Sequence, residues 1–206
     1  MKPGQTINIE TPFFVKIPKV FSRLGHTGKH YEITQWYPKP AVYDSKGWHP
    51  MPYLNQGEFY SEFGTFDVKI TLPKDYKVMA TGDLVNGEEE YAWLKGLTAF
   101  TDSLNSLSKD ELKKWIKKSQ KTKSLENRPN AGTSTSEFKT LHFRQTNVHD
   151  FAWFADKNWL VQKGELILQG RTDPITLWSF YLPKNAELWR NSIEYLHVSG
   201  YCFSNY

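Results

Sequence analysis

Two histidines, His26 and His30, stand four residues apart, a separation that lets two imidazoles bind one zinc ion from the same face of a helix. Gly25 and Gly28 flank and interrupt the pair, so a loop is expected here rather than a helix. No glutamate adjoins His26 to act as a base. The favoured interpretation is therefore a pair of loop histidines without a metal.

Other catalytic constellations are absent from the sequence. It contains no H-E-x-x-H, no P-loop, no G-x-G-x-x-G and no G-x-S-x-G. Glu58 and Glu62 could form a carboxylate pair for glycoside hydrolysis, but solvated acids beside an aromatic strand are favoured. His149 and Asp150 are adjacent, and neighbours in a strand point to opposite faces. An enzyme in its own right is not indicated.

The segment 32–54 is rich in aromatic residues and prolines, with two Trp, three Tyr and four Pro. Its rings could form a surface that stacks on sugars, as in a carbohydrate-binding β-sandwich. Alternatively, they pack a long loop onto the body of the domain, which is slightly favoured because aromatic side chains usually supply burial first. The rings in question are Trp36, Tyr37, Tyr43, Trp48 and Tyr53.

Composition narrows the class of protein. The chain has 206 residues and a formal net charge of +4, with both signs mixed along most of the sequence, which favours solubility over a nucleic-acid surface. Cys202 is the single cysteine, so no internal disulfide is possible. No apolar run approaches the length of a membrane span, and the first ten residues lack the centre of a signal peptide. The opening residues resemble a loop that feeds a strand, so we expect the chain to begin inside a longer protein.

The spacing of apolar residues along the chain predicts the strands that could position these residues. Alternating β-branched and aromatic residues predict strands, and the clearest is 63–73, with Phe66, Val68, Ile70 and Leu72 on one face. The prolines predict a loop over 38–57. Short strands separated by turn signals favour a β-sandwich or an open sheet. The predicted strands cover 6–18, 31–37, 63–73, 138–148, 159–169 and 175–183.

Helices are expected in two places. Ser108 and Glu111 form a capping box that begins an amphipathic helix over 109–120. This helix belongs to an insertion over 86–137, which has too few apolar residues for a core of its own. A second helix is expected over 184–199, with one side formed by Leu188, Trp189, Ser192, Tyr195, Leu196 and Ser199.

One long stretch, 34–84, resembles a known family. It carries Thr34-Gln35, then the proline- and aromatic-rich segment 36–53, then a strand F-x-V-x-I-x-x-P over 66–73, and then a short strand ending in Thr-Gly at 81–82. These elements, in this order, resemble the N-terminal domain of aminopeptidase N-like zinc metallopeptidases (gluzincins), most closely the Bacteroidetes-type branch. The segment "NVHDFAWFADKNW" is similar to the V-x-D-F-A-W strand of the same family. The resemblance spans about 13–206.

The resemblance implies a mainly β domain over 1–183, a β-sandwich with a saddle-like twisted sheet, carrying one inserted helix. A helical segment over 184–206 would lead toward a catalytic domain. It also implies that Gln35 reaches into the active-site cleft and holds the N-terminal residue of a peptide substrate, since a carboxamide accepts from an ammonium group and donates to a carbonyl. The alternative for Gln35 is an ordinary strand residue.

The departures from the family are equally informative. The family needs H-E-x-x-H with a distant glutamate for zinc, and G-x-M-E-N for the free amine, and neither motif occurs here. We therefore expect no catalysis by this chain alone, no cofactor in it, and zinc only in a full-length parent. Its expected partners are the catalytic domain and, through it, a peptide, with no nucleic acid and no membrane. Relatives are commonly exported to the periplasm or beyond. The alternative function is a stand-alone module that binds glycan or peptide through exposed aromatics.

Overall fold

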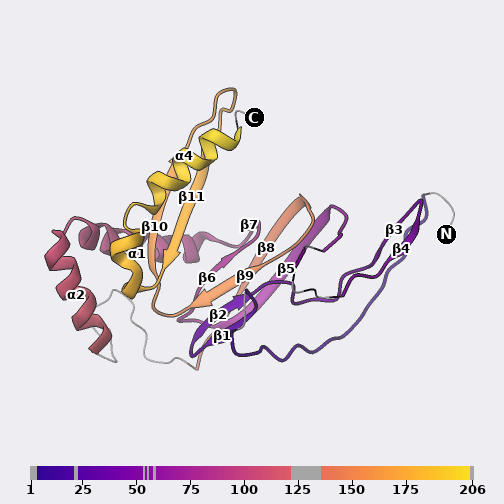
Figure 1. Ribbon diagram of the computed structural model, residues 1–206, viewed down its shortest axis with the longest axis horizontal. Helices are drawn as coiled ribbons and strands as arrows, with labels where there is room; N and C mark the ends of the chain where they lie inside the picture. The colour runs from indigo at the N-terminus through magenta and orange to yellow at the C-terminus, as the bar shows by residue number, and fades with distance from the viewer. Residues whose placement is uncertain are drawn as a thin grey trace.

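The structure is a computed structural model that describes residues 4–20, 23–52, 54, 56–57, 59–121 and 136–204 (Figure 1). More of these residues lie in strands than in helices, which confirms the prediction of a mainly β fold. The strands are β1 (Gly25–Thr27), β2 (His30–Ile33), β3 (Val42–Asp44), β4 (Gly47–His49), β5 (Gly64–Pro73), β6 (Lys77–Ala80), β7 (Asp83–Leu84), β8 (Phe138–Val148), β9 (Trp153–Asp156), β10 (Leu160–Leu166) and β11 (Ile175–Tyr181). The helices are α1 (Glu88–Asn105), α2 (Lys109–Lys121), α3 (Ala186–Trp189) and α4 (Ser192–Ser204), with a 3₁₀ turn η1 (Pro183–Asn185).

The strands form antiparallel sheets, of which two share the main core. One sheet has the order β1-β2-β9-β6 and the other the order β5-β8-β7. The predicted alternation of β5 is confirmed, because Ile70 and Leu72 are buried while Lys69 and Thr71 are exposed. Side chains of both sheets and their connections meet in one buried cluster, made of Ile70, Leu72, Tyr76, Val78, Leu141, Phe143, Phe151 and Ala155.

The remaining strands form two separate ribbons. β10 and β11 pair over their full lengths, from Leu160 opposite Tyr181 to Leu166 opposite Ile175. β3 and β4 form a short hairpin inside the segment 38–57. The prediction of a loop over 38–57 was therefore wrong in part, because Gly47 takes a φ of +107° and closes a tight turn between the prolines.

The described part of the insertion contains two helices, where one was predicted, and it takes part in the core. Leu94 and Leu97 of α1 pack on Val161 of β10. Leu112 of α2 is fully buried in a cluster that includes Leu160. These helices share their core with the β10–β11 ribbon, and the described part of 86–137 forms no separate core.

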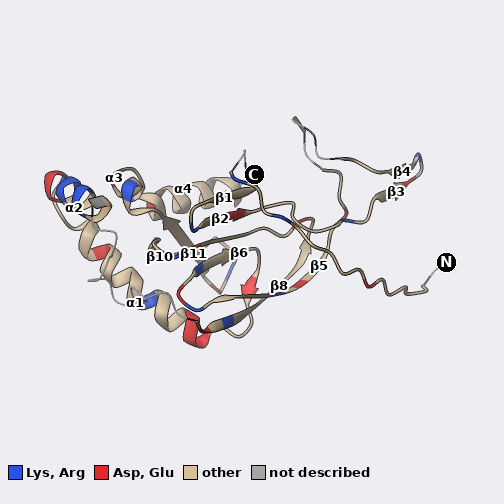
Figure 2. Cartoon of the chain, turned by 90° about the horizontal axis from the view of Figure 1, so that it is seen from below, with Lys and Arg blue, Asp and Glu red and all other residues tan. Residues whose placement is uncertain are grey.

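The start of α2 is as predicted. Glu111 accepts hydrogen bonds from the backbone N–H of Ser108 at 3.0 Å and from its hydroxyl at 2.6 Å, and the Glu111 N–H donates to the Ser108 Oγ at 3.3 Å. These hydrogen bonds form the capping box expected from the spacing of the two residues. Figure 2 shows lysines gathered on this helix, on the outside of the molecule.

The predicted strand over 6–18 was wrong. The segment is extended and leaves the body of the molecule in both Figure 1 and Figure 2, but it pairs with no strand in the described part of the chain. Its first backbone hydrogen bond to the body is donated by the His26 N–H to the Pro18 carbonyl. Alternation correctly identified an extended backbone, while a partner strand is missing from the described residues.

The C-terminal helical region is broken into η1, α3 and α4 by a turn at 190–191. The side on which Leu188, Trp189, Ser192, Tyr195, Leu196 and Ser199 were placed is largely exposed: Leu188 is 77% exposed and Tyr195 is 59% exposed. Only Ser192 of α4 is fully buried. None of the helices in the described ranges combines the length and apolar character that a membrane span requires.

Candidate functional site

Gln35 lies two residues after β2, in a left-handed backbone conformation that residues with a Cβ rarely adopt. Its φ is +52°, and Asn147 is the other non-glycine residue with a positive φ in the described part of the chain. The left-handed region costs a residue with a Cβ about 1–2 kcal/mol. Strain of this kind persists where the surroundings impose it, and it is commonest at functional positions.

The amide of Gln35 is itself unusual. Its Oε1 atom is buried and accepts no hydrogen bond from the residues that the structure describes. Gln35 borders a cavity of about 10 Å³, the room one water needs, whose other described lining residues are Arg23, Met51, Pro52, Leu54, Gly57 and Phe59. Leaving an amide oxygen unpaired in this way costs about 1–3 kcal/mol. A donor that reached this oxygen would recover that cost.

The residues after Gln35 hold this backbone in place. Trp36 donates from its indole Nε1 to the Phe151 carbonyl at 3.1 Å, and the Tyr37 hydroxyl donates to an Asp150 oxygen at 2.9 Å. Burial, followed by the hydrogen bond to Asp150, raises the pKa of Tyr37 above its ordinary value. Both rings belong to the periphery of the main core. The Gln35 backbone is thus tied to rigid parts of the fold.

The aromatic segment divides into a buried part and an exposed part. Trp36 and Tyr37 are half-buried, as expected if the rings pack a loop onto the body. Tyr43 and Trp48, in contrast, are 65% and 68% exposed and pair across the β3–β4 hairpin with ring centroids 5.0 Å apart. Tyr53 lies outside the described residues.

The same hairpin carries a small polar network. Asp44 accepts a hydrogen bond from the His49 Nε2 at 2.8 Å and from the Lys46 backbone N–H at 2.8 Å. These hydrogen bonds, that from His49 first, lower the pKa of Asp44. The network stabilises the hairpin turn and leaves the rings of Tyr43 and Trp48 free on its surface.

The histidine pair lies on a β-hairpin, so the prediction of a loop was wrong. His26 and His30 belong to the antiparallel strands β1 and β2 and not to a helix. His26 stacks on Tyr31, with ring centroids 5.8 Å apart, and His30 contacts Asp156 and Glu32. No group of three or more metal-ligating side chains occurs among the described residues. Of the carboxylate pair, Glu58 lies outside the described residues.

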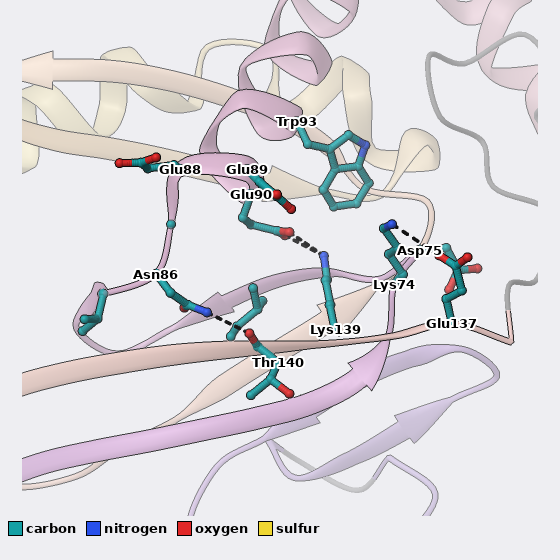
Figure 3. A pocket seen from close by; sticks show the side chains of 13 residues that line it. Lys74, Asp75, Asn86, Glu88, Glu89, Glu90, Trp93, Glu137, Lys139 and Thr140 are labelled. Atoms are coloured by element: carbon teal, nitrogen blue, oxygen red, sulfur yellow. Dashed lines mark hydrogen bonds and ion pairs between the residues drawn. The ribbon is translucent and has the colours of Figure 1, made fainter.

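A larger pocket lies where the start of α1 meets β8 (Figure 3). Its volume is about 860 Å³, and both charged and aromatic groups line it. Lys139 of β8 points across the pocket to Glu90 of α1, with its Nζ 2.6 and 2.8 Å from the two carboxylate oxygens and 4.4 Å from the centre of the Trp93 ring.

This buried ion pair fastens the insertion to the sheet. Burial raises the pKa of Glu90 and lowers the pKa of Lys139, while the contact between the two opposes both shifts. Asp75, at the same pocket, accepts a hydrogen bond from Lys157 through one oxygen at 2.5 Å, and its other oxygen is buried with no partner in the described part of the chain. The side chains here pair with one another, so the pocket resembles an anchoring site more than a reaction centre.

Sequence reasoning missed this cluster. Its local signal is "GEEEYAWL", in which a glycine and three acids precede an apolar run, as at the start of many helices. The partner Lys139 comes from a distant strand, and no local pattern reveals it.

Comparisons with protein-family models, with curated proteins and with solved structures found no match to this chain. The resemblance to the aminopeptidase family therefore depends on the sequence elements alone.

Proposed function

We propose that this chain is the non-catalytic N-terminal domain of an aminopeptidase N-like zinc metallopeptidase. In this role it packs on a catalytic domain and presents Gln35 to the first residue of a peptide substrate. The observation that carries the proposal is the state of Gln35: a strained backbone, held by Trp36 and Tyr37, with a buried amide oxygen that has no partner among the described residues. Strained residues and unpaired buried polar groups are commonest at functional sites, where a ligand can supply the missing donor.

The chemistry of Gln35 suits an N-terminal amine. An ammonium group donates several hydrogen bonds, and the unpaired Oε1 accepts one of them, while the amide N–H₂ can donate to a carbonyl. A side chain held in place before binding loses little conformational freedom when the substrate arrives. The role assigned to this chain is thus positioning, with no proton transfer.

Zinc chemistry is not assigned to this chain. The described residues offer no group of ligands for the ion, and the sequence lacks H-E-x-x-H. In the proposal, zinc belongs to the catalytic domain, where it would activate water and polarise the scissile carbonyl.

The exposed apolar surface of α4 supports a docking role. Glu194 and His197 are its only acidic or basic residues, and the rest of its exposed surface is largely apolar. Val198 is 57% exposed and Phe203 is 84% exposed. Water-exposed apolar surface of this extent marks an interface. Two glycines let α4 lie close against the ribbon: a Cβ on Gly164 would be 2.4 Å from an Ile193 methyl group, and one on Gly200 would be 2.6 Å from Leu166.

The test uses the protein translated from the reading frame extended past the codon for Tyr206, assayed on peptides with free and acetylated N-termini. Gln35→Ala should lower kcat/KM for the free amine by about tenfold to a hundredfold, as expected for loss of a hydrogen bond to a charged group. Asn147→Ala, at the other left-handed non-glycine position, is the matched control and should retain activity. Equal kcat/KM values for Gln35→Ala and the unaltered protein would refute the role of Gln35.

A second function is favoured by the exposed Tyr43–Trp48 pair. Two rings 5.0 Å apart on a hairpin tip provide an apolar platform on which a sugar or a peptide ring could stack. Titration with oligosaccharides or peptides should change the tryptophan fluorescence, and Trp48→Ala should abolish that change. No change with any glycan or peptide would leave the docking proposal as the better account.

A further inference from the structure

We propose that residues 6–18, which we call the arm, pair antiparallel with the arm of a second copy of this chain, with Phe13 on the two-fold axis. Within the described part of the chain, residues 6–17 belong to no strand and take part in no backbone hydrogen bond. Both edges of the arm are open where it leaves the body (Figures 1 and 2). An extended backbone with both edges unpaired is a template for another strand.

The two faces of the arm differ, as in a strand that packs on one side. The odd-numbered residues form a face that is apolar except at Thr11. This face turns toward the body at Phe13, whose ring centroid lies 6.0 Å from that of Trp36. Ile7 and Ile9 on this face are 61% and 77% exposed, so the face is not covered by this chain. The even-numbered residues are mostly polar or proline. The odd-numbered residues of the arm are Ile7, Ile9, Thr11, Phe13, Val15 and Ile17.

Charge and proline positions select the register. A two-fold axis at Phe13 places Glu10 opposite Lys16 of the partner, and Lys16 opposite Glu10, so two ion pairs form across the strands. The same register places Ile9 opposite Ile17. The contact is isologous, since each arm presents the same surface to the other, and the assembly therefore closes as a dimer.

Hydrogen-bond alternation fits the same register. In an antiparallel pair, opposite residues alternate between hydrogen-bonded and non-hydrogen-bonded positions. If Phe13 is a hydrogen-bonded position, all even-numbered residues have their N–H groups on the outer edge. Pro12 and Pro18 both fall there, where a missing N–H removes no bond between the strands. The Glu10–Lys16 pairs fall at the non-hydrogen-bonded positions, where opposite side chains are closer.

The first experiment measures mass by light scattering after size-exclusion chromatography, across the micromolar range, on the full chain. We expect a concentration-dependent dimer. Glu10→Lys should weaken it about tenfold, because two attractive pairs become repulsive. Lys16→Glu should do the same, and the double exchange Glu10→Lys with Lys16→Glu should restore the dimer. A monomer at every concentration would overturn the proposal.

Proline substitutions test the register independently. Ile9→Pro removes an N–H that points at the partner strand and should weaken the dimer about a hundredfold. Asn8→Pro, at the next position, removes an outward N–H and should leave the dimer intact. The arm is exposed, so neither substitution should unfold the body. Equal effects of the two prolines, or a dimer insensitive to Glu10→Lys, would overturn this pairing.

A disulfide trap locates the axis. In a background carrying Cys202→Ser, Phe13→Cys should form a dimer-linking disulfide, since hydrogen-bonded opposite residues have Cα atoms about 5.5 Å apart. Phe14→Cys is the matched control and should not link, because its copies lie two positions out of register. Linking at position 14 in place of 13 would contradict the proposed axis.

Discussion

The β10–β11 ribbon carries a helix on each face, and the two helices differ in what they bury. α1 carries a regular buried stripe, formed by Glu90, Leu94, Leu97, Thr101 and Leu104. Leu94 and Leu97 in this stripe pack on Val161 of β10, and Glu90 pairs with Lys139 of β8. α4 packs on the other face and buries Ser192 alone. α1 thus completes the core of this chain, whereas α4 presents apolar residues that the chain does not cover.

Close packing explains how α4 stays in place despite its small buried surface. Ser192 Oγ lies 2.9 Å from Gln162 Oε1 and 2.7 Å from Ser179 Oγ, all in buried positions. The Gln162 amide also donates to the Arg190 carbonyl at 3.0 Å. The helix is thus fixed by polar contacts at its start and by the absence of side chains at Gly164 and Gly200. The difference from α1 supports the proposal that α4 docks on a partner domain.

The largest expected effect is at the charged end of α1. Glu90→Gln should lower the free energy of unfolding by about 3–5 kcal/mol, because it leaves the Lys139 ammonium buried without a counter-charge. Urea unfolding followed by tryptophan fluorescence measures the change. Glu89→Gln, at the exposed neighbouring position, should stay within about 0.5 kcal/mol of the unaltered chain. Similar losses for both would mean that the ion pair does not anchor α1.

Truncating one apolar side chain on each helix tests the difference in burial between α1 and α4. Leu97→Ala on α1 should cost about 3 kcal/mol, since Leu97 is 4% exposed and its removal leaves a cavity. Val198→Ala on α4 should change the free energy of unfolding by less than about 0.5 kcal/mol in this chain. A loss of several kcal/mol for Val198→Ala would show that α4 already has its packing partner.

Two glycine substitutions compare the close packing of α4 on the ribbon with the open surface of α1. Gly164→Ala should cost about 1–3 kcal/mol, because the new Cβ would collide with Ile193 of α4. Gly96→Ala, in the middle of α1 where nothing lies within 4 Å of the new Cβ, should stabilise the chain by about 0.5–1 kcal/mol. The midpoint temperature of thermal unfolding should therefore fall for Gly164→Ala and rise for Gly96→Ala. A shift in the same direction for both variants would contradict the close packing of α4 on the ribbon.

The smallest effect is at the cap of α2. Ser108→Ala should cost about 1 kcal/mol at neutral pH, whereas Ser119→Ala within the same helix should change little.

The cost at Ser108 should depend on pH. The hydrogen bonds from Ser108 lower the pKa of Glu111. A lowered pKa means that this stabilisation is present above the ordinary glutamate pKa and is lost as the pH falls through the folded-state value. The penalty of Ser108→Ala should therefore shrink in acid, and a penalty that grows in acid would contradict the capping box.

Local patterns predicted part of this fold. The alternation of β5 and the Ser108–Glu111 spacing are short-range signals, and the structure contains both features. α1 was missed because Gly96 and two threonines weaken its helical pattern, although Leu94, Leu97 and Leu104 keep the spacing of a buried stripe. The C-terminal region shows the limit of such patterns, since periodicity shows that a face is apolar but not whether this chain covers it.

The candidate site shows the same division. Gln35 was predicted from the resemblance, and its positive φ and unpaired oxygen depend on tertiary surroundings that no local pattern encodes. The strand predicted over 6–18 needs hydrogen bonds from a partner strand, and such pairing is non-local by nature. Sequence therefore identified which segments are extended or apolar, and not what they contact.

The measurement that tests the docking account most directly uses Cys202, the single cysteine, exposed on α4. Its rate of modification by a thiol reagent would be compared in this chain and in the protein translated past the codon for Tyr206, with the modified peptide identified by mass. The account predicts that the frame continues into a domain carrying H-E-x-x-H, and that Cys202 reacts quickly in the short chain and at least about a hundredfold more slowly in the long one. A stop directly after Tyr206, or equal rates in the two proteins, would contradict it.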